Sequence, residues 1–226
     1  METSLHRQLK EIYAGDQARL EAQVERFRID VVNDGELIEI QHGSLAAIRD
    51  KVQRLLRRHR VRVVKPIVVR KQLVKQDARG GRVLARRQSP RQGSALDVFD
   101  ELVYFTRVFP HGNLSLDVPL VEIEEWRFPG HGRRRRWRQN DHQIEDQRLV
   151  NVQRVHRLVA ARDLWKLLPQ KLPRRFHTGH LAEAAGVSRA IAQRIVYCLR
   201  HAGAAETIGK QGNTVLYRRP PQTPPA

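Results

Sequence analysis

Apolar side chains recur with two alternating periods along the first part of the chain. Over residues 3–14 they are spaced three or four positions apart, which predicts an amphipathic helix that Thr3 or Ser4 can cap. Residues 18–32 carry apolar side chains at strand-like spacing, and a second extended run ends at Gln41. The sequence Asn33-Asp34-Gly35 between the two runs predicts a tight hairpin turn.

A second change of period follows this hairpin. Gly43 and Ser44 end the strand and precede a helical stripe that extends over residues 44–59. The β-branched residues over 61–76, interrupted by Pro66, then predict two short strands. The order of helix, strands, helix and strand predicts an α/β fold, and the helical connection is long enough to make its flanking strands parallel neighbours.

The middle of the chain predicts further elements of both kinds. In order they are a loop or hairpin tip at Gly80-Gly81, a helix over 94–109, a strand over 114–128, a strand over 144–151 that pairs with it, and a helix over 152–168. Glu122, Glu124 and Glu125 are expected on an exposed face of the first of these strands. The pattern leaves open whether residues 93–168 complete the first sheet or form a separate module.

The C-terminal part of the chain predicts an arrangement of its own, after a boundary marked by Pro169 and Pro173. Its elements, in order, are a short helix around 181–185, a turn at 186–188, a helix over 189–201 and a β-hairpin with its tip at 210–213. This order resembles the winged helix-turn-helix domains of bacterial regulators. The resemblance implies contact with DNA through the second helix and the wing, by Ser188, Arg189, Gln193, Arg194 and Lys210. Many winged helices contact proteins instead, and that alternative stays open here.

The charge is large and unevenly distributed. The chain carries a formal net charge of +18. Residues 49–92 hold 16 basic and 2 acidic side chains, whereas residues 1–48 hold 5 basic and 9 acidic ones. A basic surface beside an acidic region suits an enzyme that binds a polyanion and uses carboxylates for a metal. An arginine-rich surface set by genome composition is the alternative.

Other compositional features exclude several classes of protein. A single cysteine, Cys198, excludes an intrachain disulfide framework and a cysteine-rich zinc site. The chain has no apolar run of membrane-spanning length, and its first residues do not form a signal peptide. We therefore expect a cytoplasmic protein. No metal-type spacing is found among His6, His42, His111, His131 and His142. Trp126 and Trp137 flank an arginine run at 133–136, and their rings are expected either to pack within the protein or to stack on unpaired bases.

The hairpin over residues 27–41 carries the candidate chemistry. Glu39 and Gln41 lie two apart on one strand and therefore project from the same face, and the turn brings Asp30 toward them. Two carboxylates and a polar partner can hold a hard divalent cation through oxygen ligands. Carboxylates on an ordinary surface hairpin would give the same pattern.

The run FRIDVVNDGELIEIQ resembles the core of the PD-(D/E)XK nuclease superfamily, and is similar to uncharacterised bacterial proteins with an FRIDVV/ELIEIQ signature. The resemblance implies a restriction-endonuclease-like α/β/α core with a mixed sheet. It also implies that Asp30, Glu39 and the Ile40 carbonyl bind Mg²⁺ or Mn²⁺, which activates a water for phosphodiester hydrolysis. Further carboxylate candidates are Glu11, Glu21 and Glu25.

Gln41 departs from the family pattern, which has lysine at this position. Glutamine orients a water but supplies no charge, and a few restriction enzymes of the superfamily carry it. A cation can come instead from Arg49, Lys51 or Lys65. Alternatively, the fold is retained for binding only. The proline of the family pattern is absent too, since Ile29 precedes Asp30.

Together these patterns predict a metal-dependent DNA endonuclease that a winged helix targets to DNA, with catalytic residues Asp30, Glu39 and Gln41. The alternatives are a non-catalytic DNA-binding regulator and a scaffold whose winged helix contacts protein. DNA is the expected partner, no membrane contact is expected, and a homodimer is compatible with this prediction. The expected segments are a nuclease-like core over 1–92, its extension over 93–168, the winged helix over 174–219 and a disordered tail over 220–226.

Overall fold

The computed structural model describes residues 2–130 and 141–221. Within these residues the helices are α1 (Ser4–Tyr13), α2 (Arg49–Leu55), α3 (Val98–Leu102), α4 (Thr178–Ala185) and α5 (Arg189–His201), with 3-10 helices η1 (Leu45–Ile48), η2 (Ala95–Asp97) and η3 (Ala161–Leu167). The strands are β1 (Arg19–Val24), β2 (Phe27–Asn33), β3 (Glu36–Ile40), β4 (Arg60–Val64), β5 (Ile67–Gln76), β6 (Val83–Gln88), β7 (Leu114–Pro129), β8 (His142–Leu158), β9 (Glu206–Gln211) and β10 (Thr214–Arg218). The arginine run at 133–136, Trp137 and residues 222–226 lie outside the described residues.

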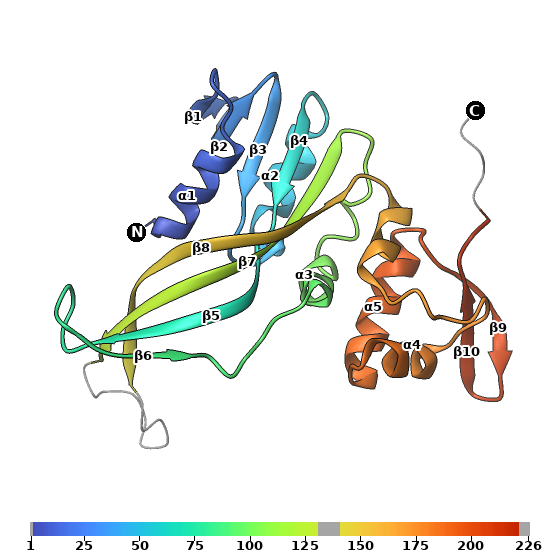
Figure 1. The fold of residues 1–226 in the computed structure, drawn as a ribbon. Coiled ribbons are helices and arrows are strands. Elements are labelled where there is room, and N and C mark those ends of the chain that lie inside the picture. The colour runs from blue at the N-terminus through green and yellow to red at the C-terminus, as the bar shows by residue number, and fades with distance from the viewer. Residues whose placement is uncertain (1, 131–140, 222–226) are drawn as a thin grey trace.

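An eight-stranded mixed sheet forms the centre of the fold, which confirms the α/β prediction (Figure 1). Its strands are hydrogen-bonded in the order β1-β2-β3-β4-β7-β5-β6, and β8 pairs with β7 as well. The pairs β3/β4, β4/β7 and β5/β7 are parallel, so α2 lies in a parallel crossover connection, as predicted. Because β7 pairs with both β4 and β5, the middle of the chain completes the sheet of the N-terminal strands.

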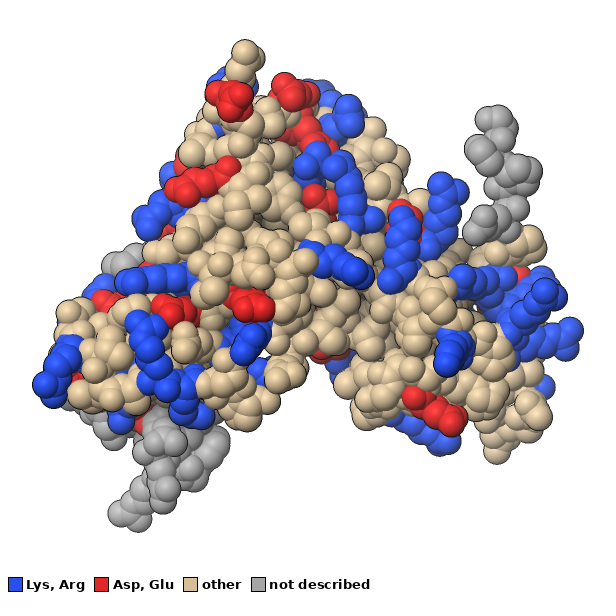
Figure 2. Space-filling view, in the orientation of Figure 1, with Lys and Arg blue, Asp and Glu red and all other residues tan. Residues whose placement is uncertain are grey.

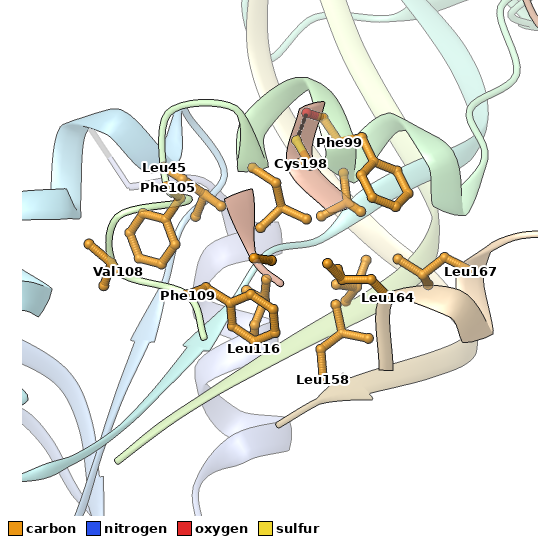
Figure 3. Close-up of a cluster of buried hydrophobic side chains, with 14 of the residues drawn as sticks. Leu45, Phe99, Phe105, Val108, Phe109, Leu116, Leu158, Leu164, Leu167 and Cys198 are labelled. Atoms are coloured by element: carbon orange, nitrogen blue, oxygen red, sulfur yellow. Dashed lines mark hydrogen bonds between the residues drawn. The ribbon is translucent and has the colours of Figure 1, made fainter. Parts of the chain in front are cut away.

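Different elements cover the two faces of the sheet. Thr3 caps α1 by accepting a hydrogen bond from the His6 amide. The buried stripe of α1, Leu5 and Leu9, packs on Val31, Ile38 and other apolar side chains of one face. On the other face, a larger cluster joins α2, α3, η3 and α5, and Figure 3 shows its centre around Phe99, Phe105 and Phe109.

The long strands extend the sheet beyond its N-terminal part. We call this extension the arm, and it consists of β5, β6 and residues 120–129 and 142–154 of β7 and β8 (Figure 1). The arm contains a buried carboxylate, because Glu125 is 1% exposed. The expectation that Glu122, Glu124 and Glu125 share an exposed face is therefore wrong for Glu125.

Several predicted boundaries are wrong. The predicted helix over 152–168 is replaced by the last part of β8 and by η3, because residues 152–158 continue the antiparallel ladder with β7. The helix predicted over 94–109 is helical only at η2 and α3, and the helix predicted over 44–59 divides into η1 and α2. Residues 18–32 form a hairpin that turns at Glu25, whose φ is +53°.

The C-terminal elements form as predicted: helix α4, a turn at Gly186, helix α5 and the antiparallel pair β9/β10. Gly186 has a φ of +63°, a left-handed conformation that ends α4 without a Cβ penalty. On α3, Phe99 accepts a hydrogen bond from the buried Cys198 thiol through its carbonyl oxygen, at 3.5 Å. In the described residues, no helix is long and apolar enough to span a membrane.

Candidate functional site

Asp30 lies in β2 beneath α1, and each of its carboxylate oxygens has a partner. The Ile40 amide donates to Oδ2 at 2.7 Å, and Oδ1 lies 3.2 Å from His6 Nε2 and 3.6 Å from Lys10 Nζ. The side chain is 15% exposed. Burial raises the pKa of Asp30, but the hydrogen bonds from His6 and Ile40 outweigh burial and hold this pKa below its usual value. Asp30 is therefore ionised and fixed in orientation.

Glu39 lies in β3 and is held from α2. Lys51 Nζ donates to both carboxylate oxygens of Glu39 at 2.7 Å, and to the Arg28 carbonyl at 2.5 Å. The Glu39 side chain is 13% exposed. Burial raises the pKa of Glu39, Lys51 opposes that rise, and the negative charge of Asp30 adds to it.

Asp30 and Glu39 lie on adjacent strands, and their partners come from helices on opposite faces of the sheet. The β2/β3 ladder pairs Val31 with Ile38, so continuing this register would place Asp30 opposite Glu39. Beyond Val31 and Ile38, the Ile40 amide donates its hydrogen bond to the Asp30 carboxylate. This donor is therefore not used for a backbone bond between β2 and β3. The β2/β3 register agrees with the hairpin that the sequence predicted, and the pairing of Asp30 with Glu39 as a site stays a prediction.

Gln41 does not join this pair. Its side-chain amide donates to the Ser44 carbonyl at 2.8 Å, and its backbone amide donates to Val64 at 2.9 Å. Lys65 is buried beside the same loop and donates to the carbonyls of His42 and Gly43 at 2.9 and 2.6 Å. Gln41 and Lys65 therefore fix the segment between β3 and η1, while Lys51 is the cation at Glu39 and Lys10 the one nearest Asp30.

A shallow hollow of about 520 Å³ opens above Asp30. It is lined by Glu2, Thr3, His6, Lys10, Glu21, Arg28, Asp30, His42 and Gln147. Among the auxiliary carboxylates, Glu21 lines the hollow and pairs with Lys10 and Arg28, Glu25 lies 3.4 Å from His59, and Glu11 is exposed on α1. In the described residues, no three His, Cys, Asp or Glu side chains are grouped as a metal-binding set.

Sequence reasoning missed the residues that α1 brings to the hollow. His6 and Lys10 are four positions apart and therefore share one face of the helix, which was the available signal. His42 lies with its ring 5.4 Å from that of His6, and burial, with the charges of His6 and Lys65, lowers the pKa of His42 to about 4. His42 is thus a neutral imidazole at neutral pH.

The predicted DNA-contacting residues occupy different environments on α5 and the β9/β10 hairpin. Arg189, Gln193 and Lys210 are exposed. Ser188 caps α5, because its hydroxyl accepts a hydrogen bond from the Ile191 amide at 3.3 Å. Arg194 forms an ion pair with Asp100 of α3, so its charge is partly neutralised within the chain.

Comparisons with known proteins identify relatives over most of the chain. The sequence profile of a family described as a domain of unknown function, DUF8091, matches residues 3–159. An uncharacterised protein of Treponema pallidum (strain Nichols) is 31% identical over 222 residues, which cover 97% of this chain and 86% of the relative. No solved structure gives a significant match.

Proposed function

The chain belongs to the DUF8091 family, and we propose that it is a metal-dependent DNA endonuclease whose reactive centre is formed by Asp30, Glu39 and Lys51. The observation that carries the proposal is the pair of mostly buried carboxylates on adjacent strands, where burial, with a smaller contribution from Asp30, raises the pKa of Glu39. Paired, desolvated carboxylates of this kind are concentrated at functional sites.

The donor set fits a hard divalent cation. Carboxylate oxygens are the ligands that Mg²⁺ and Mn²⁺ prefer, and a cation at Glu39 would favour the charged form that burial, and to a smaller extent Asp30, disfavours. Asp30, Glu39 and the Ile40 carbonyl would hold the ion. Such an ion would lower the pKa of a bound water and stabilise the leaving oxygen of a phosphodiester.

The chain itself supplies the positive charge that Gln41 lacks. Lys51 lies at Glu39 from the following helix, and it is the one of the three proposed substitute cations, Arg49, Lys51 and Lys65, that contacts this carboxylate. A lysine there can stabilise the charge that develops on the phosphate in the transition state. Gln41 is a positioning residue in this proposal, because its bond to Ser44 holds the loop that leads into η1 and α2.

The order of the N-terminal helices and strands supports the same proposal. The order α1, β1, β2, β3, α2 and β4, with β3 and β4 parallel, is the order expected of a restriction-endonuclease-like core. We propose that α4, α5 and the β9/β10 hairpin act as a winged helix on duplex DNA. Arg189 and Gln193 would contact the major groove, and Lys210 would contact a phosphate.

Nicking of supercoiled plasmid tests this proposal. The wild-type protein should nick DNA with Mg²⁺ or Mn²⁺ and not with excess chelator, and Asp30→Asn should lower the rate by at least about a hundredfold. Asp34→Asn is the matched control, because Asp34 is an exposed turn residue of the same hairpin, with a φ of +47° that asparagine tolerates. Equal rates for the two variants would refute the assignment of Asp30.

A second candidate function is a DNA-binding regulator without nuclease activity. The observation that favours it is that Lys10 and Lys51 already place a positive charge beside each of the two carboxylates. This function predicts that plasmid, branched and single-stranded DNA all stay uncut with either metal, while DNA binding persists and weakens steeply with salt. Cleavage of any of the three substrates that depends on Asp30 would exclude it.

A further inference from the structure

Two hollows lie on the same face of the sheet and are joined by a buried carboxylate. The first is the hollow above Asp30, which Gln147 of β8 lines. Gln147 donates to Glu125 at 2.9 Å, and Glu125 also pairs with Arg127. Arg127 lines the second hollow, of about 550 Å³, on the arm. Arg127 follows Glu125 by two residues, roughly 7 Å along the strand, so one lining residue of each hollow contacts the same carboxylate.

The second hollow is lined by three cationic side chains and one acidic side chain. Its lining includes Lys75 of β5, Arg87 of β6 and Arg127 of β7, together with the acidic Asp141 and with His142. Lys75 is paired directly with Arg127 in the strand register, and like charges in that position are destabilising. Glu125 balances Arg127, but no described residue forms an ion pair with Lys75 or Arg87. An anion from outside the chain would remove this repulsion.

The floor of the second hollow is apolar. Leu73, Ala85, Phe128 and Pro129 line it together with the cations. Leu73 is 7% exposed and Phe128 is half-buried, and both line the hollow. Figure 2 shows lysine and arginine side chains gathered over the end of the arm, with acidic side chains nearer the sheet. Phosphate-binding cations over an aromatic floor match the two parts of a nucleotide.

We propose that the hollow on the arm binds a nucleotide of a single-stranded nucleic-acid segment, with its phosphate at Lys75 and Arg87 and its base on Phe128. The inference rests on the proposed function, because it adds a binding track that leads the strand toward the hollow above Asp30. A single strand is the occupant that fits, since its bases are free to stack on an aromatic side chain. In a duplex the bases are stacked on one another and present only their edges in the grooves.

Binding measurements on the full chain in chelator test this proposal separately from cleavage. The probes are a fluorescent oligothymidylate and a duplex of mixed sequence. The double variant Lys75→Gln/Arg87→Gln should bind the oligothymidylate about tenfold more weakly near 0.1 M salt. The slope of log binding constant against log salt concentration should become smaller by about 1.4. Phe128→Leu should weaken single-strand binding by about tenfold without changing the salt dependence. Duplex affinity should change little in both variants.

The control is Arg19→Gln/Arg107→Gln, which removes the same charge at exposed positions that line neither hollow. The proposal is overturned if the Lys75→Gln/Arg87→Gln variant binds the oligothymidylate as tightly as this control does. It is also overturned if that variant loses equal affinity for single strand and duplex. Plasmid nicking that depends on Asp30, together with unchanged binding by the arm variants, refutes the track and leaves the nuclease proposal standing. Arm-dependent binding by a protein that never cuts refutes the nuclease and supports the track.

Discussion

Asp30 and Glu39 are two mostly buried carboxylates whose pKa values are displaced in opposite directions. Burial acts on both, but Asp30 accepts hydrogen bonds from His6 and Ile40, whereas Glu39 relies on Lys51 alone. Asp30 is therefore the member of the pair that stays ionised to lower pH. Glu39 is the member whose charge is most stabilised by an additional cation.

The depressed pKa of Asp30 predicts how its removal affects stability. A carboxyl with a lowered pKa in the folded state stabilises the fold above its unfolded value of about 3.9, and this contribution is lost as the pH falls through the folded pKa. Asp30→Asn should lower the free energy of unfolding by about 1–3 kcal/mol at pH 7. Urea unfolding should show the difference shrinking near pH 3. A difference that is the same at both pH values would contradict the ionic role of Asp30.

Lys51 should matter for reaction more than for folding. Lys51→Met removes the cation that lies 2.7 Å from both Glu39 oxygens, so the nicking rate should fall by about a hundredfold or more, and Lys51→Arg should retain part of it. The control is Arg54→Met, which removes an exposed charge from the same helix. Nicking by Lys51→Met at the rate of Arg54→Met would remove Lys51 from the centre.

The C-terminal helices pack against α3 through a buried interface. Cys198 of α5 is 1% exposed, and burial raises the pKa of its thiol to about 12. The thiolate is the reactive form, so Cys198 should resist iodoacetamide at pH 8 in the folded protein and react once urea unfolds it. Mass spectrometry measures the labelling. Rapid modification without denaturant would show that α5 separates from α3.

The arm depends on a single buried carboxylate. Glu125 accepts hydrogen bonds from Lys71 at 2.7 Å and Gln147 at 2.9 Å, and pairs with Arg127. Glu125→Ala leaves these cations unpaired, which should cost about 3–5 kcal/mol and reduce hydrogen-exchange protection in β5 and β8. Glu122→Ala, at a partly exposed position of the same strand, is the control. Equal protection in the two variants would mean that Glu125 does not hold the arm together.

Element boundaries followed the sequence where local signals and pairing agreed. The turn after Asn33 and the helix α5 were predicted because glycine, a cap and apolar periodicity coincide there. The end of β8 was predicted as a helix because Val152, Val155 and Leu158 are spaced three apart. This segment is a strand because it pairs with β7. A local sequence pattern carries no information about which distant strand will pair with it.

At the scale of the molecule, one sheet connects the candidate centre to the arm. The buried apolar cluster extends from Ile29 through α3 to Tyr217, so the N-terminal sheet and the C-terminal helices share a core. The sequence predicted the α/β order and the hairpin that carries Asp30 and Glu39. It did not predict the hollow, because His6, His42 and Gln147 meet there from three distant segments.

The most direct test of the reactive centre is a crystal structure of the protein soaked in Mn²⁺, because it does not depend on knowing the substrate. We expect an anomalous peak between Asp30 and Glu39, with oxygen ligands at about 2.1 Å and Lys51 displaced from at least one Glu39 oxygen. The Asp30→Asn crystal should lose the peak. A wild-type crystal with no peak, and with Lys51 still bound to both Glu39 oxygens, would contradict the proposed nuclease centre.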